Sequence, residues 1–118
     1  MIDDIRDYAR IGLAHFMFYP DCVVDEQVNI TTLPGILARD DIELVDFCLP
    51  YDVAGRARLT AALRACDKHL GFAIHPFPLD KICLGTTVDN EKALTRMILE
   101  DQVAAAAAAG ADAFTIAS

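Results

Sequence analysis

Short apolar runs alternate along the chain with longer stretches of helical periodicity. A short apolar run bounded by turn residues is typical of a strand that is buried on both faces. The predicted strands span residues 10–18, 42–49, 71–76 and 113–117. The predicted helices span residues 31–39, 55–69 and 90–109. The chain therefore repeats one unit, a strand followed by a helix.

The helix over residues 55–69 has the clearest pattern. Its apolar stripe consists of Leu59, Leu63, Cys66 and Leu70. Gly71 is expected just after its last turn, and His69 at its carboxyl end, where a cation is favourable. Thr31 and Thr32 are the expected N-cap candidates of the helix over residues 31–39, and Gly110 is expected to end the last helix.

Strict alternation of strands and helices indicates an α/β fold with a parallel sheet. With right-handed crossovers and no hairpin signal, the expected strand order is 1-2-3-4. Two layouts fit: an open doubly wound sheet, or half of a closed eight-stranded barrel. The chain has no glycine-rich dinucleotide motif and no P-loop, and residues 15–17 (HFM) replace the acidic residues of receiver domains. The open, flavodoxin-like binding domain is therefore the weaker hypothesis.

Length and composition indicate that residues 1–118 form one domain or less than one, with 54% hydrophobic residues. A net charge of −8 argues against nucleic acid or an anionic membrane as a partner. No apolar run approaches the roughly 18 residues of a membrane helix, and the N-terminus lacks a signal-peptide core. The four cysteines form no CxxC motif, so we expect small buried residues in a reducing cytoplasm.

Three residues are candidates for binding substrate. His15 and His75 close the first and third apolar runs, and the ends of parallel strands point the same way. We therefore expect both histidines on one rim of the sheet, lining a pocket or bonded to loops, with Glu43 near that rim. Glu43 interrupts an apolar strand, so its carboxylate either faces the pocket or pairs with an arginine. Asp46 has the opposite parity on the same strand, which weakens a mechanism based on a carboxylate pair.

A family resemblance rests on four segments: IGLAH at 11–15, IEL at 42–44, FAIHP at 72–76 and AAAGAD at 107–112. Together with the loop and helix at 84–110, which include Arg96, they resemble the sugar phosphate isomerases/epimerases. These are xylose isomerase-like TIM barrels, a group that also includes a type of DNA repair endonuclease. The resemblance covers nearly the whole chain but only the first four of the family's eight β/α units.

The resemblance implies the N-terminal half of a (β/α)8 barrel from a metal-dependent sugar (phosphate) isomerase or epimerase. Such enzymes shift a proton or hydride between adjacent carbons of a sugar or polyol. The implied cofactor of the complete barrel is Mn²⁺ or Mg²⁺, with Zn²⁺ as an alternative. In the repair-enzyme branch the residue matching His75 binds metal, which makes His75 the metal candidate here.

The family's main metal ligands come from the fifth to eighth strands, which this sequence does not contain. We therefore expect this chain alone to be inactive, with no metal firmly bound. Its expected partners are a sugar or polyol and either the missing C-terminal half or a second copy of itself. The alternative is a non-catalytic half-barrel that binds a partner or self-associates. An inner face exposing residues such as Leu13 and Phe72 is expected to drive that association.

Overall fold

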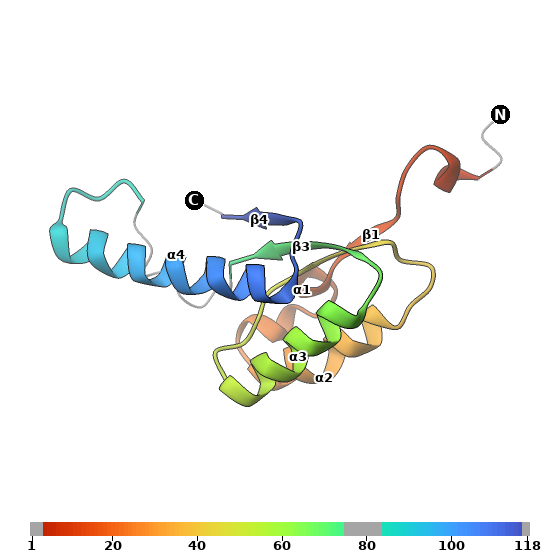
Figure 1. The fold of residues 1–118 in the computed structure, drawn as a ribbon, viewed down its shortest axis with the longest axis horizontal. Coiled ribbons are helices and arrows are strands. Elements are labelled where there is room, and N and C mark those ends of the chain that lie inside the picture. Colours follow the sequence, from red (N-terminus) through yellow and green to blue (C-terminus); the bar gives the residue numbers. More distant parts are fainter. Residues whose placement is uncertain (1–3, 75–83, 117–118) are drawn as a thin grey trace.

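The computed structural model of the chain describes residues 4–74 and 84–116. Its centre is one four-stranded sheet in which every neighbouring pair is parallel and the order is β1-β2-β3-β4, as expected from the sequence (Figure 1). The strands are β1 (Gly12–Ala14), β2 (Leu44–Phe47), β3 (His69–Ala73) and β4 (Ala113–Thr115). The α/β class and the parallel sheet are thus confirmed.

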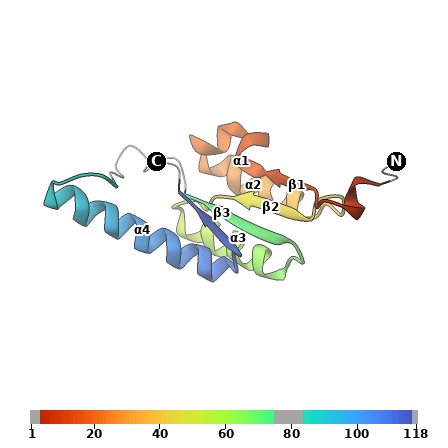
Figure 2. The same cartoon turned by 90° about the horizontal axis from the view of Figure 1, so that it is seen from above.

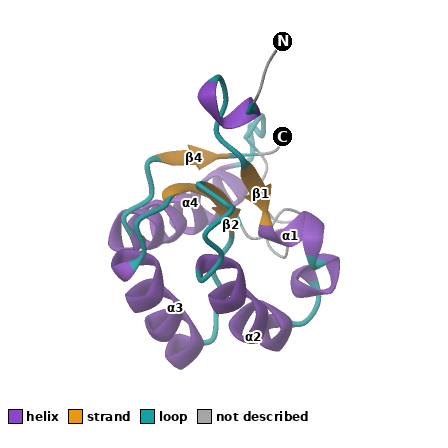
Figure 3. Cartoon of the chain, turned by 90° about the vertical axis from the view of Figure 1, so that its right-hand side faces the viewer, coloured by secondary structure: helices purple, strands orange, loops and turns teal. Residues whose placement is uncertain are grey.

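Helices connect the strands. They are α1 (His15–Phe18), α2 (Glu26–Leu37), α3 (Val53–Ala65) and α4 (Asp89–Ala109), with 3-10 turns η1 (Ile5–Asp7) and η2 (Pro20–Val23). Figure 2 looks onto the sheet from the side opposite α2 and α3, which lie behind the strands. In the end-on view of Figure 3, α2, α3 and α4 likewise lie on one side of the sheet. Among the described residues, the sheet therefore has a helix-covered face and an open face.

The helix-covered face holds the core. Val45 and Phe47 of β2 and Leu70 and Phe72 of β3 are buried there against α2, α3 and α4. The Phe72 ring packs edge-on against Phe47 at 5.4 Å between centroids and stacks on Phe114 at 5.5 Å. Leu13 also packs against this core. The expectation that Leu13 and Phe72 would line the uncovered face is therefore wrong, since these alternate positions point toward the helices.

The open face carries mostly small side chains at the intervening strand positions. These positions are Gly12, Ala14, Gly71, Ala73, Ala113 and Thr115. The larger Leu44 and Asp46 lie against glycines of neighbouring strands. A Cβ atom built on Gly71 would be only 1.9 Å from Asp46 Oδ1, and one on Gly12 would be 3.1 Å from the Leu44 side chain. A side chain at position 71 would therefore displace the Asp46 carboxylate from the place that it occupies here.

Two element boundaries differ from the sequence prediction near the N-terminus. The first strand is shorter than expected, because the chain turns into α1 at His15. Helix α2 begins at Glu26, where the Asp25 side chain accepts a hydrogen bond from Gln27 N at 2.9 Å. Thr31 therefore lies inside the helix, and its hydroxyl donates to the Gln27 carbonyl at 2.8 Å. The cap expected at Thr31 is wrong because Asp25 caps the helix one and a half turns earlier.

The end of α3 also differs. The helix stops at Ala65, and Cys66 is its C-cap in an extended conformation. His69 and Gly71, expected at the helix end, belong to β3 instead. Gly110, in contrast, ends α4 as expected, with a left-handed φ of 77° that glycine adopts without strain.

Two segments extend beyond the sheet. The N-terminal half of α4 projects past one end, and η1 lies apart from the sheet at the other (Figures 1 and 2). The resulting extents are 55 × 34 × 24 Å. Within the described residues, no helix is both long and apolar enough to cross a membrane.

Candidate functional site

Most of the polar side chains that are buried or that have unpaired polar atoms lie near the carboxyl ends of the strands. His15 follows β1 directly and is fully buried. Its Nε2 lies 2.8 Å from Thr32 Oγ1, whose hydroxyl donates to the Val28 carbonyl at 2.6 Å. Because that hydroxyl proton is already used, Nε2–H is the donor to Thr32. Nδ1 is then an acceptor, and it has no partner among the described residues.

Burial lowers the pKa of His15 to about 4, so its imidazole is neutral near pH 7. The ring packs against Tyr19, with 5.5 Å between centroids, and bonds to α2. It therefore lies on the helix side of the sheet and not on the open face. The structure places His15 at the expected edge but does not direct it into a pocket on the open face.

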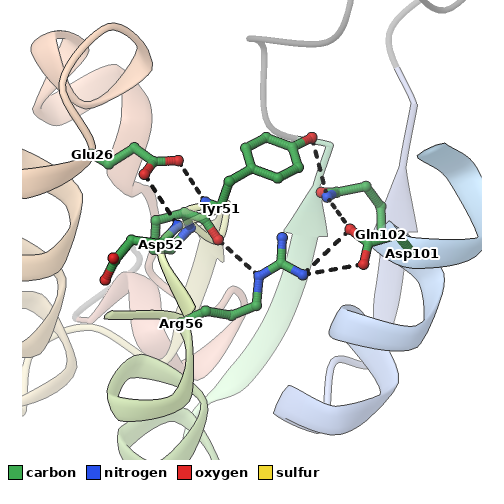
Figure 4. Close-up of polar contacts among 7 residues, drawn as sticks. Glu26, Tyr51, Asp52, Arg56, Asp101 and Gln102 are labelled. Carbon is green, nitrogen blue, oxygen red and sulfur yellow. Dashed lines mark hydrogen bonds and ion pairs between the residues drawn. The ribbon is translucent and has the colours of Figure 1, made fainter. Parts of the chain in front are cut away.

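Glu26 holds the connection from β2 to α3. Its carboxylate accepts from Tyr51 N at 2.5 Å and from Asp52 N at 3.1 Å (Figure 4). Asp52 in turn caps α3 by accepting from Gly55 N at 2.6 Å. Gly55 leaves no room for a side chain, since an added Cβ would be 2.3 Å from Ile30. The first turns of α2 and α3 are thereby fixed to the end of β2.

Arg56 continues this network to α4. Its Nε donates to the Pro50 carbonyl at 2.8 Å, and its Nη1 lies 3.3 Å from both Asp101 oxygens (Figure 4). The guanidinium carbon lies 5.4 Å from the Tyr51 ring centroid. Gln102 Nε2 donates to Asp101 at 3.1 Å and to the Tyr51 hydroxyl at 3.3 Å. Burial and the nearby Asp101 charge raise the pKa of Tyr51.

Four buried polar atoms have no hydrogen-bond partner among the described residues. They are His15 Nδ1, Asn29 Oδ1, Arg56 Nη2 and Gln102 Oε1. Two of them lie on residues bonded to the chain just after β2, because Asn29 Nδ2 donates to the Cys48 carbonyl at 3.0 Å and Arg56 donates to Pro50. Gln102 joins them through the Tyr51 hydroxyl. Buried groups normally find partners, so this concentration marks the carboxyl edge as unusual.

Three cysteines lie among the described residues. Cys22 and Cys48 are fully buried and Cys66 is half-buried, and all three are free. The hydrogen bond that the Cys48 thiol donates to Cys22, together with burial, raises the pKa of Cys48. These two cysteines are the small buried residues that the sequence predicted.

Asp46 is the ionisable side chain on the carboxyl half of the open face. It lies one residue before the end of β2, level with Ala14 on β1 and Gly71 on β3. Its small neighbours leave the carboxylate half-exposed. From the sequence, only the side of the strand on which Asp46 lies relative to Glu43 was predicted. Two features of the sequence could have indicated Asp46: it is an acidic residue within an apolar strand, and the neighbouring strand has a glycine, Gly71, at the paired position.

Glu43 lies at the opposite edge of the sheet. It precedes β2, where its N–H donates to the Ile11 carbonyl at 2.8 Å and its carbonyl accepts from His69 N at 2.9 Å. The side chain is exposed. The expectation that Glu43 lies near the same rim as His15 is therefore wrong. Glu43 precedes its strand, whereas His15 follows its strand, so the two residues lie at opposite edges of the sheet. His69 is also at this amino edge, where it contacts Arg10 and has Nδ1 3.6 Å from Asp112.

His75 lies outside the described residues, so its position relative to His15 and its role as a metal ligand stay predictions. Within the described ranges 4–74 and 84–116, no group of three or more His, Cys, Asp or Glu residues could hold a metal ion. Asp46 could supply one ligand oxygen, which is too few for a divalent cation.

Comparisons of the chain with protein-family models, with curated proteins and with solved structures found no match.

Proposed function

We propose that the four β/α units are the N-terminal half of a (β/α)8 barrel of the xylose isomerase-like type. One observation carries the proposal: the strand order is 1-2-3-4 and all the long helices cover the same face. Right-handed crossovers that always advance in one direction place every helix on one side, as in a barrel. A doubly wound sheet reverses direction and has helices on both sides.

The proposed activity is that of a sugar (phosphate) isomerase or epimerase, to which this chain contributes one wall of the site. In barrels the reaction takes place at the carboxyl ends of the strands. Asp46 supplies a hydroxyl-binding carboxylate there, and the small residues Ala14, Ala73 and Thr115 leave room for a sugar or polyol. A carboxylate oxygen accepts hydrogen bonds from two vicinal hydroxyls, which suits such a substrate.

The described residues do not fit the metal of the complete family barrel, because their donor set on the carboxyl half of the open face is one carboxylate. We assign no reaction step to it in this chain. The further ligands would come from a second half, so the chain alone is expected to be inactive. A cytoplasmic location is part of the proposal and rests on the sequence, whose four cysteines form no CxxC motif.

The same open face supports a second candidate, a non-catalytic module that binds a partner or self-associates. Strands β1 and β4 each pair with a single neighbour among the described residues, so each leaves one backbone edge available. Both candidates use these edges. They differ in whether the carboxyl half of the open face binds sugar.

Titration of the ¹⁵N-labelled chain with D-fructose 6-phosphate and with sorbitol, followed by NMR, tests the proposal. We expect weak binding that shifts the amide signals of Ala14, Asp46 and Ala73 and is lost in Asp46→Ala. Residues at the amino edge, such as Glu43, serve as the internal control. Shifts confined to that edge, or no shift at tens of millimolar ligand, would favour the non-catalytic module.

A further inference from the structure

Helix α3 differs in charge from the other long helices. It contains Arg56, Arg58 and Arg64 and no acidic residue, in a chain whose net charge is −8. Helix α4 has four acidic and two basic residues, and α2 has one acidic and none basic. Arginine side chains thus gather on one helix of an otherwise acidic protein.

A groove of about 610 Å³ runs along this helix. Its floor consists of Val53, Ala57 and Ala61, which recur every four residues and so lie on one face of α3. Val53 is 82% exposed although it is apolar. The face is separate from the buried stripe of Leu59 and Leu63, which packs on the sheet. The floor is therefore apolar surface that the described chain leaves uncovered.

Arginines lie at the two ends of the groove and bridge α3 to α4. Arg56 reaches Asp101 at 3.3 Å, and Arg64 Nη1 donates to the Ala108 carbonyl at 3.0 Å. The two arginines are eight residues apart, which is about 12 Å along a helix. On the groove face the residues between them are Ala57, Thr60 and Ala61, whose side chains are short.

The positive charge of the groove is only partly neutralised. Asp101 offsets Arg56, whose Nη2 still has no hydrogen-bond partner among the described residues. Arg64 has no ion pair with a described acidic residue. Tyr51 borders the Arg56 end of the groove with its ring. The groove thus combines an apolar floor with an available cation at one end.

We propose that this groove binds a small amphipathic anion, namely a carboxylate on a short acyl chain. The apolar chain lies on Val53, Ala57 and Ala61, and the carboxylate pairs with Arg64. The volume is within the range of roughly 300–1,000 Å³ of small-molecule sites, whereas a stable protein interface needs a larger surface. The site is on the helix layer, away from the open face, and does not depend on the barrel proposal.

Decanoate below its micelle-forming concentration is the probe, and 1-decanol is its uncharged counterpart. In ¹⁵N NMR titrations of the full chain we expect decanoate to shift the amides of Val53, Ala57 and Ala61 and to bind more tightly than decanol. Arg64→Gln is expected to weaken decanoate binding roughly two- to fivefold and to leave decanol binding unchanged, as for loss of one exposed charge pair. Arg58→Gln, on the same helix but outside the groove, is the matched control with less than about a twofold effect.

A second variant, Ala61→Glu, places a carboxylate on the exposed floor and is expected to abolish decanoate binding while the circular dichroism spectrum is retained. Equal weakening by Arg64→Gln and Arg58→Gln would overturn the proposal, since it would show that the positive charge of the helix attracts decanoate without a specific binding site. Shifts confined to the open face, or tighter binding of an acidic amphipathic peptide than of decanoate, would also overturn it.

Discussion

The two faces of the sheet are built from the same strands but differ in burial and in coverage by helices. Along β3, Phe72 is fully buried between Phe47 and Phe114, whereas the next residue, Ala73, faces the side without helices. Along β2, Val45 is buried in the core and Asp46 is half-exposed beside Gly71. The helix-covered face supplies the stability of the chain. The open face stabilises little and is available for a ligand or a second half-barrel.

The largest expected effect is on the helix-covered face. Phe72→Ala removes a fully buried ring with two aromatic neighbours and is expected to lower the free energy of unfolding by about 4 kcal/mol. Ala73→Ser, one residue further on the open face, is the control and is expected to cost less than about 0.5 kcal/mol. Urea denaturation of both variants measures the difference. Similar losses would mean that the two faces are equally packed.

The second largest expected effect is a decrease in the free energy of unfolding at low pH, caused by His15. Its pKa is lowered from 6.5 to about 4 by burial. Between these values the unfolded chain binds a proton that the folded chain does not, so stability is full above pH 6.5 and falls as the pH drops toward 4. The loss reaches up to about 3 kcal/mol.

Urea denaturation of the unmodified chain and of His15→Gln between pH 7 and pH 4.5 measures this loss. The difference between the two chains cancels the carboxylates that they share. A difference that does not change with pH would contradict the buried neutral imidazole.

A smaller effect is expected where the open face is crowded. Gly71→Ala places a methyl group at the position of the Asp46 carboxylate, which must then turn aside, and is expected to cost about 1 kcal/mol. Asp46→Ala alone is expected to change stability by less than about 0.5 kcal/mol, because the side chain is half-exposed. The double variant should recover most of the loss, since the clash is gone. Strict additivity in this cycle would show that Asp46 does not lie over Gly71.

The alternation of strands and helices was enough to predict the parallel sheet and its order, because each apolar run and amphipathic stretch has a distinct period. Helix ends were predicted less well where a residue typical of a helix end has a different role, set by a contact with a residue far away in the sequence. Gly71 looked like a helix stop, but its lack of a side chain serves the Asp46 carboxylate on the neighbouring strand. Nothing local to Gly71 in sequence reveals that contact.

The site residues were predicted less well for the same reason. His15 was placed at the correct edge because strand ends can be recognised from sequence, but the turn into α1 directs it toward Thr32. Glu43 was assigned to the wrong edge although it starts its apolar run, because the burial of a carboxylate was weighed above its place in the strand. The hydrogen bond from Tyr51 N to Glu26 and the Arg56–Asp101 pair join residues 25 or more positions apart. Sequence spacing rules describe only local contacts and do not predict such pairs.

The most direct test of the open face is the reactivity of a cysteine placed on it. Ala73→Cys, in a chain with Cys66→Ser and Cys83→Ser, is treated with a maleimide at nanomolar protein concentration, where association is negligible. Ala107→Cys on the exposed side of α4 gives the reference rate. The account predicts that residue 73 reacts within about tenfold of the reference, because no described helix covers it. Protection by several orders of magnitude would contradict the account, since it would mean that the chain covers this face itself.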